Sequence, residues 1–211
     1  MINPNSNQAV TDGLVGALEV FKPTGAFIEC VTLQSGPYGI ETQADIESVT
    51  LPLAEIVRSR TDVDCFVIAC YSDPGLHVCR DATDKPVLGI QESGVLTALA
   101  RGDRFGVIAL HPASIRRHLR YLRQMCVTGR LANERSVNLS VAQSASADGT
   151  FNSLVEVGMQ LRDTDGADTV ILGCAGMAKH RANLEQKLGI PVIDPVQAAV
   201  GLGISLSSLN M

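Results

Sequence analysis

The chain has 211 residues, 45% of them hydrophobic and 18% charged, and it carries a net charge of −5 at neutral pH. No apolar run approaches the roughly 18 residues that a membrane-spanning helix needs, and an acidic chain lacks the clustered Lys and Arg of a nucleic-acid surface. The composition therefore predicts a globular protein with neither a membrane nor a nucleic acid as its partner, long enough for one large or two small domains.

The predicted elements alternate between short apolar runs and amphipathic stretches, the pattern of βαβ units around mostly parallel sheets. The predicted strands cover 1–2, 26–32, 65–70, 86–90, 105–110, 137–142, 169–173 and 191–193. The predicted helices cover 7–20, 43–59, 76–83, 92–100, 112–127, 150–164, 178–188 and 195–205. The fold class expected from this alternation is α/β.

The N-terminal segment has no basic region, apolar stretch or cleavage site of a secretion signal, so we expect a cytoplasmic protein. In that compartment cysteines stay reduced, and the six cysteines show no CxxC or His-paired spacing of a metal site. The arginines of helix 112–127 recur at helical spacing, which most often marks a solvated face: Arg116, Arg117, Arg120 and Arg123.

Two cysteines occur in matching surroundings. Cys70 and Cys174 each end an apolar strand-like run and precede a short loop that contains glycine, and they are 104 residues apart. Pro86 and Pro191, which open the next apolar runs, are 105 residues apart. Because such a period is too long for a solenoid unit, we interpret it as a duplication that produced two similar α/β halves.

The expected domain organisation follows from this repeat. The first half covers 1–93 and the second covers 94–193, with the boundary near Gly94 and with 194–211 returning to the first half. The loops 35–39 and 144–149 occupy corresponding places, and neither is long enough to separate independent modules. Halves related by a pseudo-two-fold axis would place the active site in the cleft between them.

The position of the two cysteines favours chemistry. In open parallel sheets ligands bind beyond the carboxyl ends of the strands, and pseudo-symmetry would bring both cysteines face to face there. Inversion of a stereocentre requires a base on one face and an acid on the other, which one thiolate and one thiol provide. Since Asp73 lies near Cys70 and disfavours a second negative charge, we hypothesise that Cys174 is the resting thiolate and Cys70 the resting thiol.

A structural interpretation of the cysteines stands beside the catalytic one. An unpaired cysteine usually packs as a small hydrophobic side chain. We adopt that interpretation for four of them, Cys30, Cys65, Cys79 and Cys126. For the repeated pair it remains the alternative. If the pair is catalytic, the carbanion also needs stabilisation, and the candidate donors are the backbone amides of Ser72, Asp73, Ala175 and Gly176.

Several of these residues carry a resemblance to a known family. The chain resembles the aspartate/glutamate/hydantoin racemase superfamily, and within it the hydantoin and allantoin racemases. The resemblance covers essentially the whole chain and rests on Asn3-Pro4-Asn5, Gly36-Pro37, the segment 69–76, Gly89-Ile90 with Glu92, and the segment 172–177. It implies cofactor-independent racemisation by two cysteines, a pseudo-symmetric two-domain fold and a homo-oligomer.

One departure from the family concerns the expected cleft. Hydantoin racemases favour paired threonines after the strand that opens the second half, where this chain has Ala109 and Leu110 followed by His111. His111 either contacts substrate or caps the next helix. Apart from Lys179, the loops expected around the cleft carry mainly neutral polar side chains, a composition that suits a neutral ring better than a dicarboxylate: Asn3, Asn5, Ser6, Ser35, Ser72, Ser114 and Ser144.

The sequence thus predicts a racemase or epimerase, with a small-molecule substrate and no cofactor, that inverts the carbon next to a carbonyl in a cyclic amide such as a 5-substituted hydantoin or allantoin. The predicted catalytic residues are Cys70 and Cys174. The predicted substrate-binding residues are Asn3, Asn5, Gly36, Pro37, Tyr71, Ser72, Asp73, His111, Ala175 and Gly176. Asn3 could equally form a turn or helix cap, and Glu92 could merely begin a helix.

Four alternatives to this function remain open. Three are enzymes of the same superfamily: an amino-acid racemase of the Asp/Glu type, a decarboxylase that needs one protonating cysteine, and a cis-trans isomerase that uses one cysteine as nucleophile. The fourth is a non-catalytic small-molecule-binding protein in which the cysteines pack.

Overall fold

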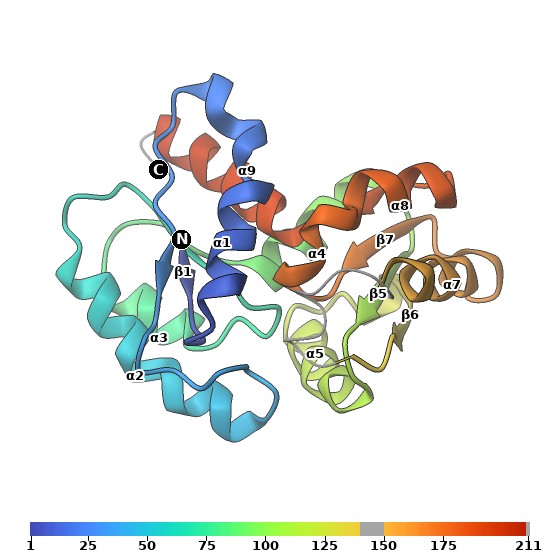
Figure 1. Cartoon of the computed structure of the whole chain (residues 1–211), viewed down its shortest axis with the longest axis horizontal. Coiled ribbons are helices and arrows are strands. Elements are labelled where there is room, and N and C mark those ends of the chain that lie inside the picture. The colour runs from blue at the N-terminus through green and yellow to red at the C-terminus, as the bar shows by residue number, and fades with distance from the viewer. Residues whose placement is uncertain (140–149, 210–211) are drawn as a thin grey trace.

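Two four-stranded sheets form the framework of the computed structural model, which describes residues 1–139 and 150–209 (Figure 1). The first sheet has the order β2-β1-β3-β4 and the second the order β6-β5-β7-β8, and all neighbouring strands are parallel. The strands are β1 (Ile2–Asn3), β2 (Val31–Thr32), β3 (Phe66–Ile68), β4 (Val87–Gly89), β5 (Phe105–Ala109), β6 (Leu131–Ser136), β7 (Thr169–Leu172) and β8 (Val192–Ile193).

Helices connect and flank these strands, so the predicted α/β class is confirmed. The α-helices are α1 (Gln8–Ala17), α2 (Gln43–Ser59), α3 (Leu76–Asp81), α4 (Ile90–Arg101), α5 (Pro112–Gln124), α7 (Thr150–Asp163), α8 (Arg181–Leu188) and α9 (Pro195–Ser208). Short 3₁₀ segments are η1 (Glu19–Thr24), η2 (Thr128–Arg130) and η3 (Ala175–His180).

The two sheets repeat one topology. In each, the first strand lies between the second and the third, and the fourth pairs with the third. Cys70 lies two residues beyond the end of β3, and Cys174 lies two residues beyond the end of β7. The equivalent strands therefore carry the two cysteines at equivalent places, as the repeat in the sequence predicts.

The strand predicted at 137–142 is wrong in position. The second sheet instead uses β6, whose sequence is mostly polar and whose one fully buried residue is Glu134. The prediction followed apolar residues, but β6 pairs with β5 alone and is an edge strand, where exposed positions tolerate polar side chains. Residues 140–142, like the predicted loop 144–149, lie outside the described residues.

The start of α4 also differs from its prediction. Ile90 begins the helix rather than ending a strand, because Asp73 accepts hydrogen bonds from the backbone amides of Gln91 at 2.9 Å and Glu92 at 2.8 Å. A capping carboxylate from another segment satisfies amides that would otherwise lack partners. This contact is not visible in the local sequence.

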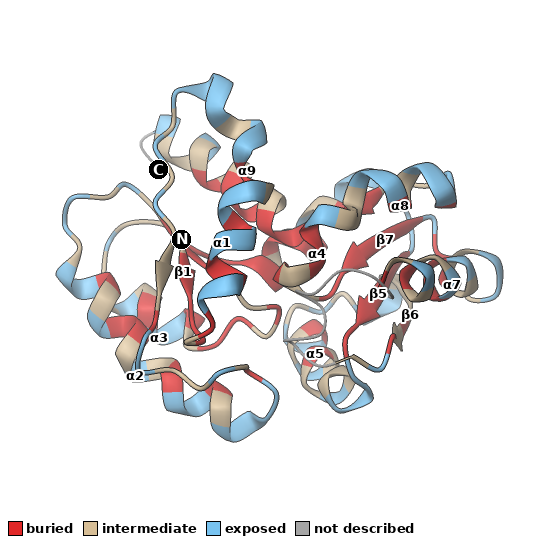
Figure 2. Cartoon of the chain, in the orientation of Figure 1, coloured by how far each residue is buried: buried red, intermediate tan, exposed pale blue. Residues whose placement is uncertain are grey.

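The hydrophobic core joins the two halves. Figure 2 shows buried residues along the strands and on the faces of α4 and α9 between the sheets. One buried cluster combines Val67 of β3, Ile171 of β7, Val95 of α4 and Val200 of α9. Because α9 packs on α4 and contacts β3, β4 and η3, it lies against both halves. The domain boundary near Gly94 stays a prediction.

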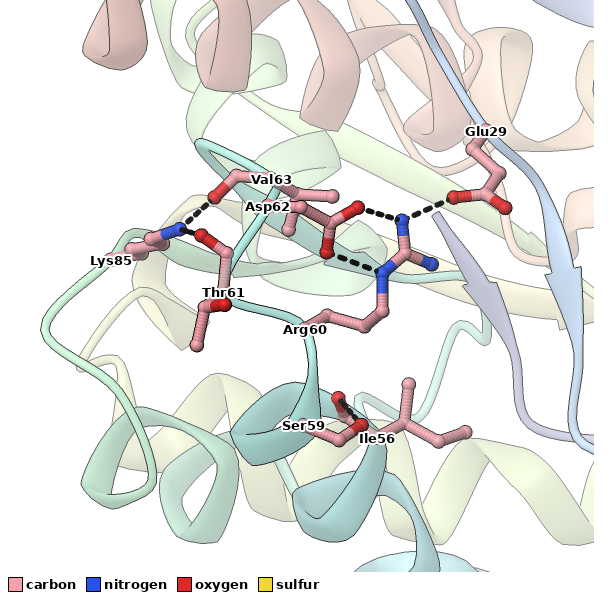
Figure 3. Close-up of polar contacts among 8 residues, drawn as sticks. All are labelled: Glu29, Ile56, Ser59, Arg60, Thr61, Asp62, Val63 and Lys85. Atoms are coloured by element: carbon pink, nitrogen blue, oxygen red, sulfur yellow. Dashed lines mark hydrogen bonds and ion pairs between the residues drawn. The ribbon is translucent and has the colours of Figure 1, made fainter.

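Polar contacts order the amino-terminal side of the first sheet (Figure 3). The guanidinium of Arg60 donates to Asp62 at 2.7 and 2.9 Å and to Glu29 at 2.6 Å, while the ammonium of Lys85 donates to the carbonyls of Thr61 and Val63. These contacts join the segment before β3 to the segment before β2. None of the described helices combines the length and the apolar character needed to cross a membrane.

Candidate active site

A cavity of about 540 Å³ lies at the carboxyl ends of the strands and is lined by both halves of the chain. Cys70 and Cys174 both line it. A second cavity of about 520 Å³ lies at the opposite side, beside Met1, Arg60 and Phe66 at the strand starts. Because parallel sheets bind ligands beyond their carboxyl ends, the first cavity is the candidate site, and its volume is usual for a small-molecule site.

The predicted site residues divide into two groups. Those that line the cavity with the cysteines are Asn5, Tyr71, Ser72, His111 and Ala175. Those that lie outside its lining are Asn3, Gly36, Pro37, Asp73 and Gly176.

Asn3 acts inside the first half rather than at the cavity. Its side chain is fully buried and donates to the Oδ1 of Asn5 at 3.1 Å and the Oγ1 of Thr11 at 3.0 Å. The same Oδ1 of Asn5 accepts the amide of Asn7 at 3.0 Å. Asn3 therefore holds the turn that presents Asn5 to the cavity, in agreement with the turn alternative.

Gly36 and Pro37 support this turn from behind. The carbonyl of Pro37 accepts the amide of Ser6 at 2.9 Å. A Cβ atom added to Gly36 would lie 2.3 Å from the carbonyl oxygen of Pro4, so this close approach admits only glycine. The two residues position the turn and lie outside the cavity lining, and their contact with substrate stays a prediction.

Asp73 holds the loop after Cys70. Its carboxyl group is buried and caps α4. The backbone of Asp73 has a positive φ of 42°. Gly89 makes room for it, because a Cβ there would lie 2.1 Å from the carboxyl carbon. Burial raises the pKa of Asp73 to about 7, although the amides of Gln91 and Glu92 oppose that rise. Asp73 is thus a capping residue outside the cavity lining, and its contact with substrate stays a prediction.

The surroundings of Cys70 favour its protonated form. Burial raises the pKa of the Cys70 thiol to about 12, the amide of Ser72 lowers it, and the charges of Cys174 and Asp73 raise it further. A negative charge on Cys174 thus disfavours a second one on Cys70. This supports opposite protonation states, with Cys70 as the thiol.

Backbone amides of the two loops donate hydrogen bonds to the cysteine sulfurs. The amide of Gly176 donates to the Sγ of Cys174 at 3.4 Å, and the amide of Ser72 acts likewise on Cys70. The amide of Asp73 donates to the carbonyl of Cys70 at 3.0 Å. These three predicted donors to a carbanion are therefore directed at the cysteines.

His111 is both a helix cap and a lining residue. Its Nδ1 accepts the amide of Ala113 at 3.2 Å at the start of α5, and the residue is largely exposed at the cavity wall. The capping alternative is confirmed, and a contact with substrate stays a prediction.

Sequence reasoning missed a cation at the site. Three arginines of α5 are exposed as expected: Arg116, Arg120 and Arg123. Arg117 instead lines the cavity, and its Nε is buried without a partner among the described residues. Its charge lowers the pKa of Cys70. Helical spacing could have indicated that Arg117 is partly buried. His118 and Leu122 form the buried face of α5, and Arg117 flanks that face.

Sequence reasoning also missed a buried histidine–glutamate contact beside the cavity. The Nδ1 of His118 lies 2.5 Å from the Oε1 of Glu134, and the side chains are 3% and 1% exposed. His118 lines the cavity, and its ring meets the edge of Tyr71 at a centroid distance of 5.0 Å and an interplanar angle of 81°. No local pattern marks this pair, since its members come from α5 and the edge strand β6.

The arrangement offers one small-molecule cavity with an ionisable sulfur from each half, an amide directed at each sulfur, and a nearby cation. Such a site can remove a proton from one face of a bound molecule and supply a proton to the other face.

Comparison with known proteins agrees with this chemistry. The Asp/Glu/Hydantoin racemase family model matches residues 1–203. Hydantoin racemases of Paenarthrobacter aurescens and of a Pseudomonas species are 35% and 36% identical, with 100% of this chain and 91% and 86% of theirs covered. The structure of allantoin racemase from Klebsiella pneumoniae matches with a TM-score of 0.95 and 29% identity, over 100% of this chain and 87% of that one. The chain belongs to the Asp/Glu/hydantoin racemase family.

Proposed function

We propose that the protein is a cofactor-independent racemase that inverts the stereocentre next to a carbonyl in a 5-substituted hydantoin or in allantoin. The observation that carries the proposal is the single cavity lined by Cys70 and Cys174 at equivalent positions beyond β3 and β7. The similarity to proteins named hydantoin racemase and allantoin racemase supports the substrate class.

The proposed reaction uses each sulfur once per turnover. The thiolate of Cys174 takes the proton from C5, the electrons of that C–H bond delocalise onto the adjacent carbonyl oxygen, and the thiol of Cys70 returns a proton to the opposite face. The other enantiomer reacts in the reverse direction, with the roles exchanged. The raised pKa of Cys70 supports its assignment as the resting acid.

The character of the cavity supports a neutral ring as substrate. Apolar side chains from both halves line it, among them Ile40 and Leu110, and its charged lining includes both Glu41 and Arg117. A site for a dicarboxylate would instead gather cations, because carboxylates usually meet Arg or Lys. This favours the hydantoin class over an amino-acid racemase of the Asp/Glu type.

Single-cysteine variants test the mechanism. With 5-methylhydantoin or allantoin, Cys70→Ala and Cys174→Ala are each expected to lose inversion, measured by polarimetry, and Cys126→Ser at an exposed cysteine is expected to retain it. If either alanine variant still interconverts enantiomers, the two-base mechanism is wrong.

Isotope exchange separates the alternatives. In D₂O, a racemase incorporates deuterium at C5 of hydantoin as it inverts that carbon, whereas a decarboxylase releases CO₂ from a malonate-type acid and a cis-trans isomerase converts an alkene. A binding protein does none of these. Absence of exchange with every hydantoin tested would refute the proposed function.

We further propose that the protein acts in the cytoplasm as a homo-oligomer. In support, no disulfide joins any of the six cysteines, all of which lie within the described ranges, and large apolar side chains are exposed at Val20, Phe27 and Leu51. Sedimentation velocity would reveal the assembly, and a monomer at micromolar concentration would contradict it.

A further inference from the structure

Removal of the C5 proton places negative charge on the adjacent carbonyl oxygen, which needs a hydrogen-bond donor in the transition state. The amides of Ser72 and Gly176 are directed at the sulfurs, and the amide of Asp73 is bonded to a carbonyl. The donors that remain for the oxygen are the amide of Ala175 and the side chains of the cavity wall, among them Arg117 and His118.

His118 has the surroundings that such a donor requires. It lines the cavity, yet its side chain is only 3% exposed, so its ring is fixed by packing. Glu134 holds Nδ1 at 2.5 Å and Tyr71 packs against the ring. Because Nδ1 is occupied, Nε2 is the ring nitrogen that remains to meet a ligand.

The contact with Glu134 leaves Nε2 free to act as the donor of the ring when both nitrogens carry hydrogen. The carboxylate of Glu134 is buried beside Tyr71, and its second oxygen has no partner among the described residues. A buried carboxyl group needs a hydrogen-bond partner, and His118 is the side chain in contact with this one. In the imidazolium form both ring nitrogens carry hydrogen, so Nε2 can donate while Nδ1 binds Glu134.

We propose that His118 is a further catalytic residue, which donates a hydrogen bond from Nε2 to the carbonyl oxygen next to the stereocentre, and that Glu134 is the positioning residue that fixes its ring. This rests on the proposed racemase function. The hydrogen bond strengthens as the C–H bond breaks and charge reaches the oxygen, so its contribution falls on kcat rather than on KM.

Variants of both residues test this role with 5-methylhydantoin as substrate. His118→Leu is expected to lower kcat by about 100- to 1000-fold, with KM changed by less than about threefold. His118→Gln retains a side-chain N–H donor and is expected to recover much of the loss. Glu134→Gln is expected to lower kcat with little change in KM, and His77→Gln, at an exposed histidine of α3, should match wild type.

Equal kcat in His118→Leu and wild type would overturn the inference, and so would folded His118→Gln protein as inactive as His118→Leu. A wild-type protein that racemises no hydantoin would overturn the proposed function itself, and the inference with it.

An NMR measurement on wild-type protein avoids any dependence on the folding of variants. With ¹⁵N-labelled histidine, both nitrogens of His118 are expected to resonate as protonated, and Nε2 is expected to shift when 5-methylhydantoin is added. An unprotonated Nε2 resonance in the bound state would overturn the inference.

Discussion

At the scale of single residues, two buried carboxyl groups cap helices close to the junction of the halves. Asp73 caps α4, and Asp194 caps α9 by accepting the amide of Val196 at 2.9 Å. Burial raises their pKa values to about 7 and about 6, while the capping amides oppose the rise. These groups bind protons more tightly in the folded protein than in the unfolded chain, so they make stability depend on pH.

The expected effect of Asp73 is a loss of stability as pH rises. Its pKa lies above the unfolded value of 3.8, so its contribution is full below about pH 4 and is lost as pH rises through about 7. Between these limits the free energy of unfolding should fall less steeply with pH in Asp73→Asn than in wild type. The two slopes should differ by at most about 1.4 kcal/mol per pH unit. Urea denaturation across the range measures the difference, and Asp84→Asn is an exposed control. An unchanged slope in Asp73→Asn would contradict the burial effect.

At the scale of elements, helix starts contribute side chains to the cavity. Thr42 begins α2 in a capping box, where its Oγ1 accepts the amide of Asp45 at 3.1 Å and its own amide donates to the Asp45 carboxylate at 2.7 Å. His111 begins α5. Both line the cavity, so the residues that end loops and start helices also shape the site.

The two roles of His111 are separable. His111→Ala removes the cap and is expected to lower the free energy of unfolding by about 1 kcal/mol, whereas His111→Asn retains a good N-cap and should stay near wild type. Urea denaturation checks both. A raised KM in both variants would indicate a substrate contact in addition to the cap, and equal instability of both variants would contradict the capping role.

At the scale of the whole molecule, α4 and α9 connect the two sheets (Figure 1). Gly94 of α4 faces this junction, where an added Cβ would lie 3.0 Å from the Cβ of Pro195 and 3.3 Å from a methyl group of Ile171. The separation of the halves therefore depends on a close packing contact. Because Cys70 and Cys174 come from different halves, the distance between their sulfurs depends on it as well.

Gly94→Ala is expected to destabilise the protein by about 1–2 kcal/mol, because overpacking against Pro195 and Ile171 outweighs the helix-forming gain of alanine. It is also expected to lower racemase activity, because the two sulfurs come from the parts that this contact joins. Gly13→Ala in α1 is the matched control: no atom lies within 4 Å of the added Cβ, so the change should stabilise by about 0.5–1 kcal/mol. Thermal unfolding and polarimetry measure both effects. A Gly94→Ala protein as stable and active as wild type would contradict the packing argument.

Local patterns predicted the elements whose side chains face the core. The helix 43–59 agrees with α2 at both ends because an apolar stripe and a capping box mark it. The edge strand β6 was missed because its residues are mostly polar, and the start of α4 was misplaced because its cap comes from Asp73. Edges and caps depend on partners that are distant in sequence.

The sequence by itself determined the duplicated α/β plan and the two strand-end cysteines, because strand periodicity and the repeat are properties of the chain alone. The tertiary structure decided which polar groups face the cavity. Arg117 and His118, which contacts Glu134, line the cavity. Four predicted site residues instead position the loops around it: Asn3, Gly36, Pro37 and Asp73. The physical reason is that a buried polar group must find its partner in space, and that partner here comes from another element.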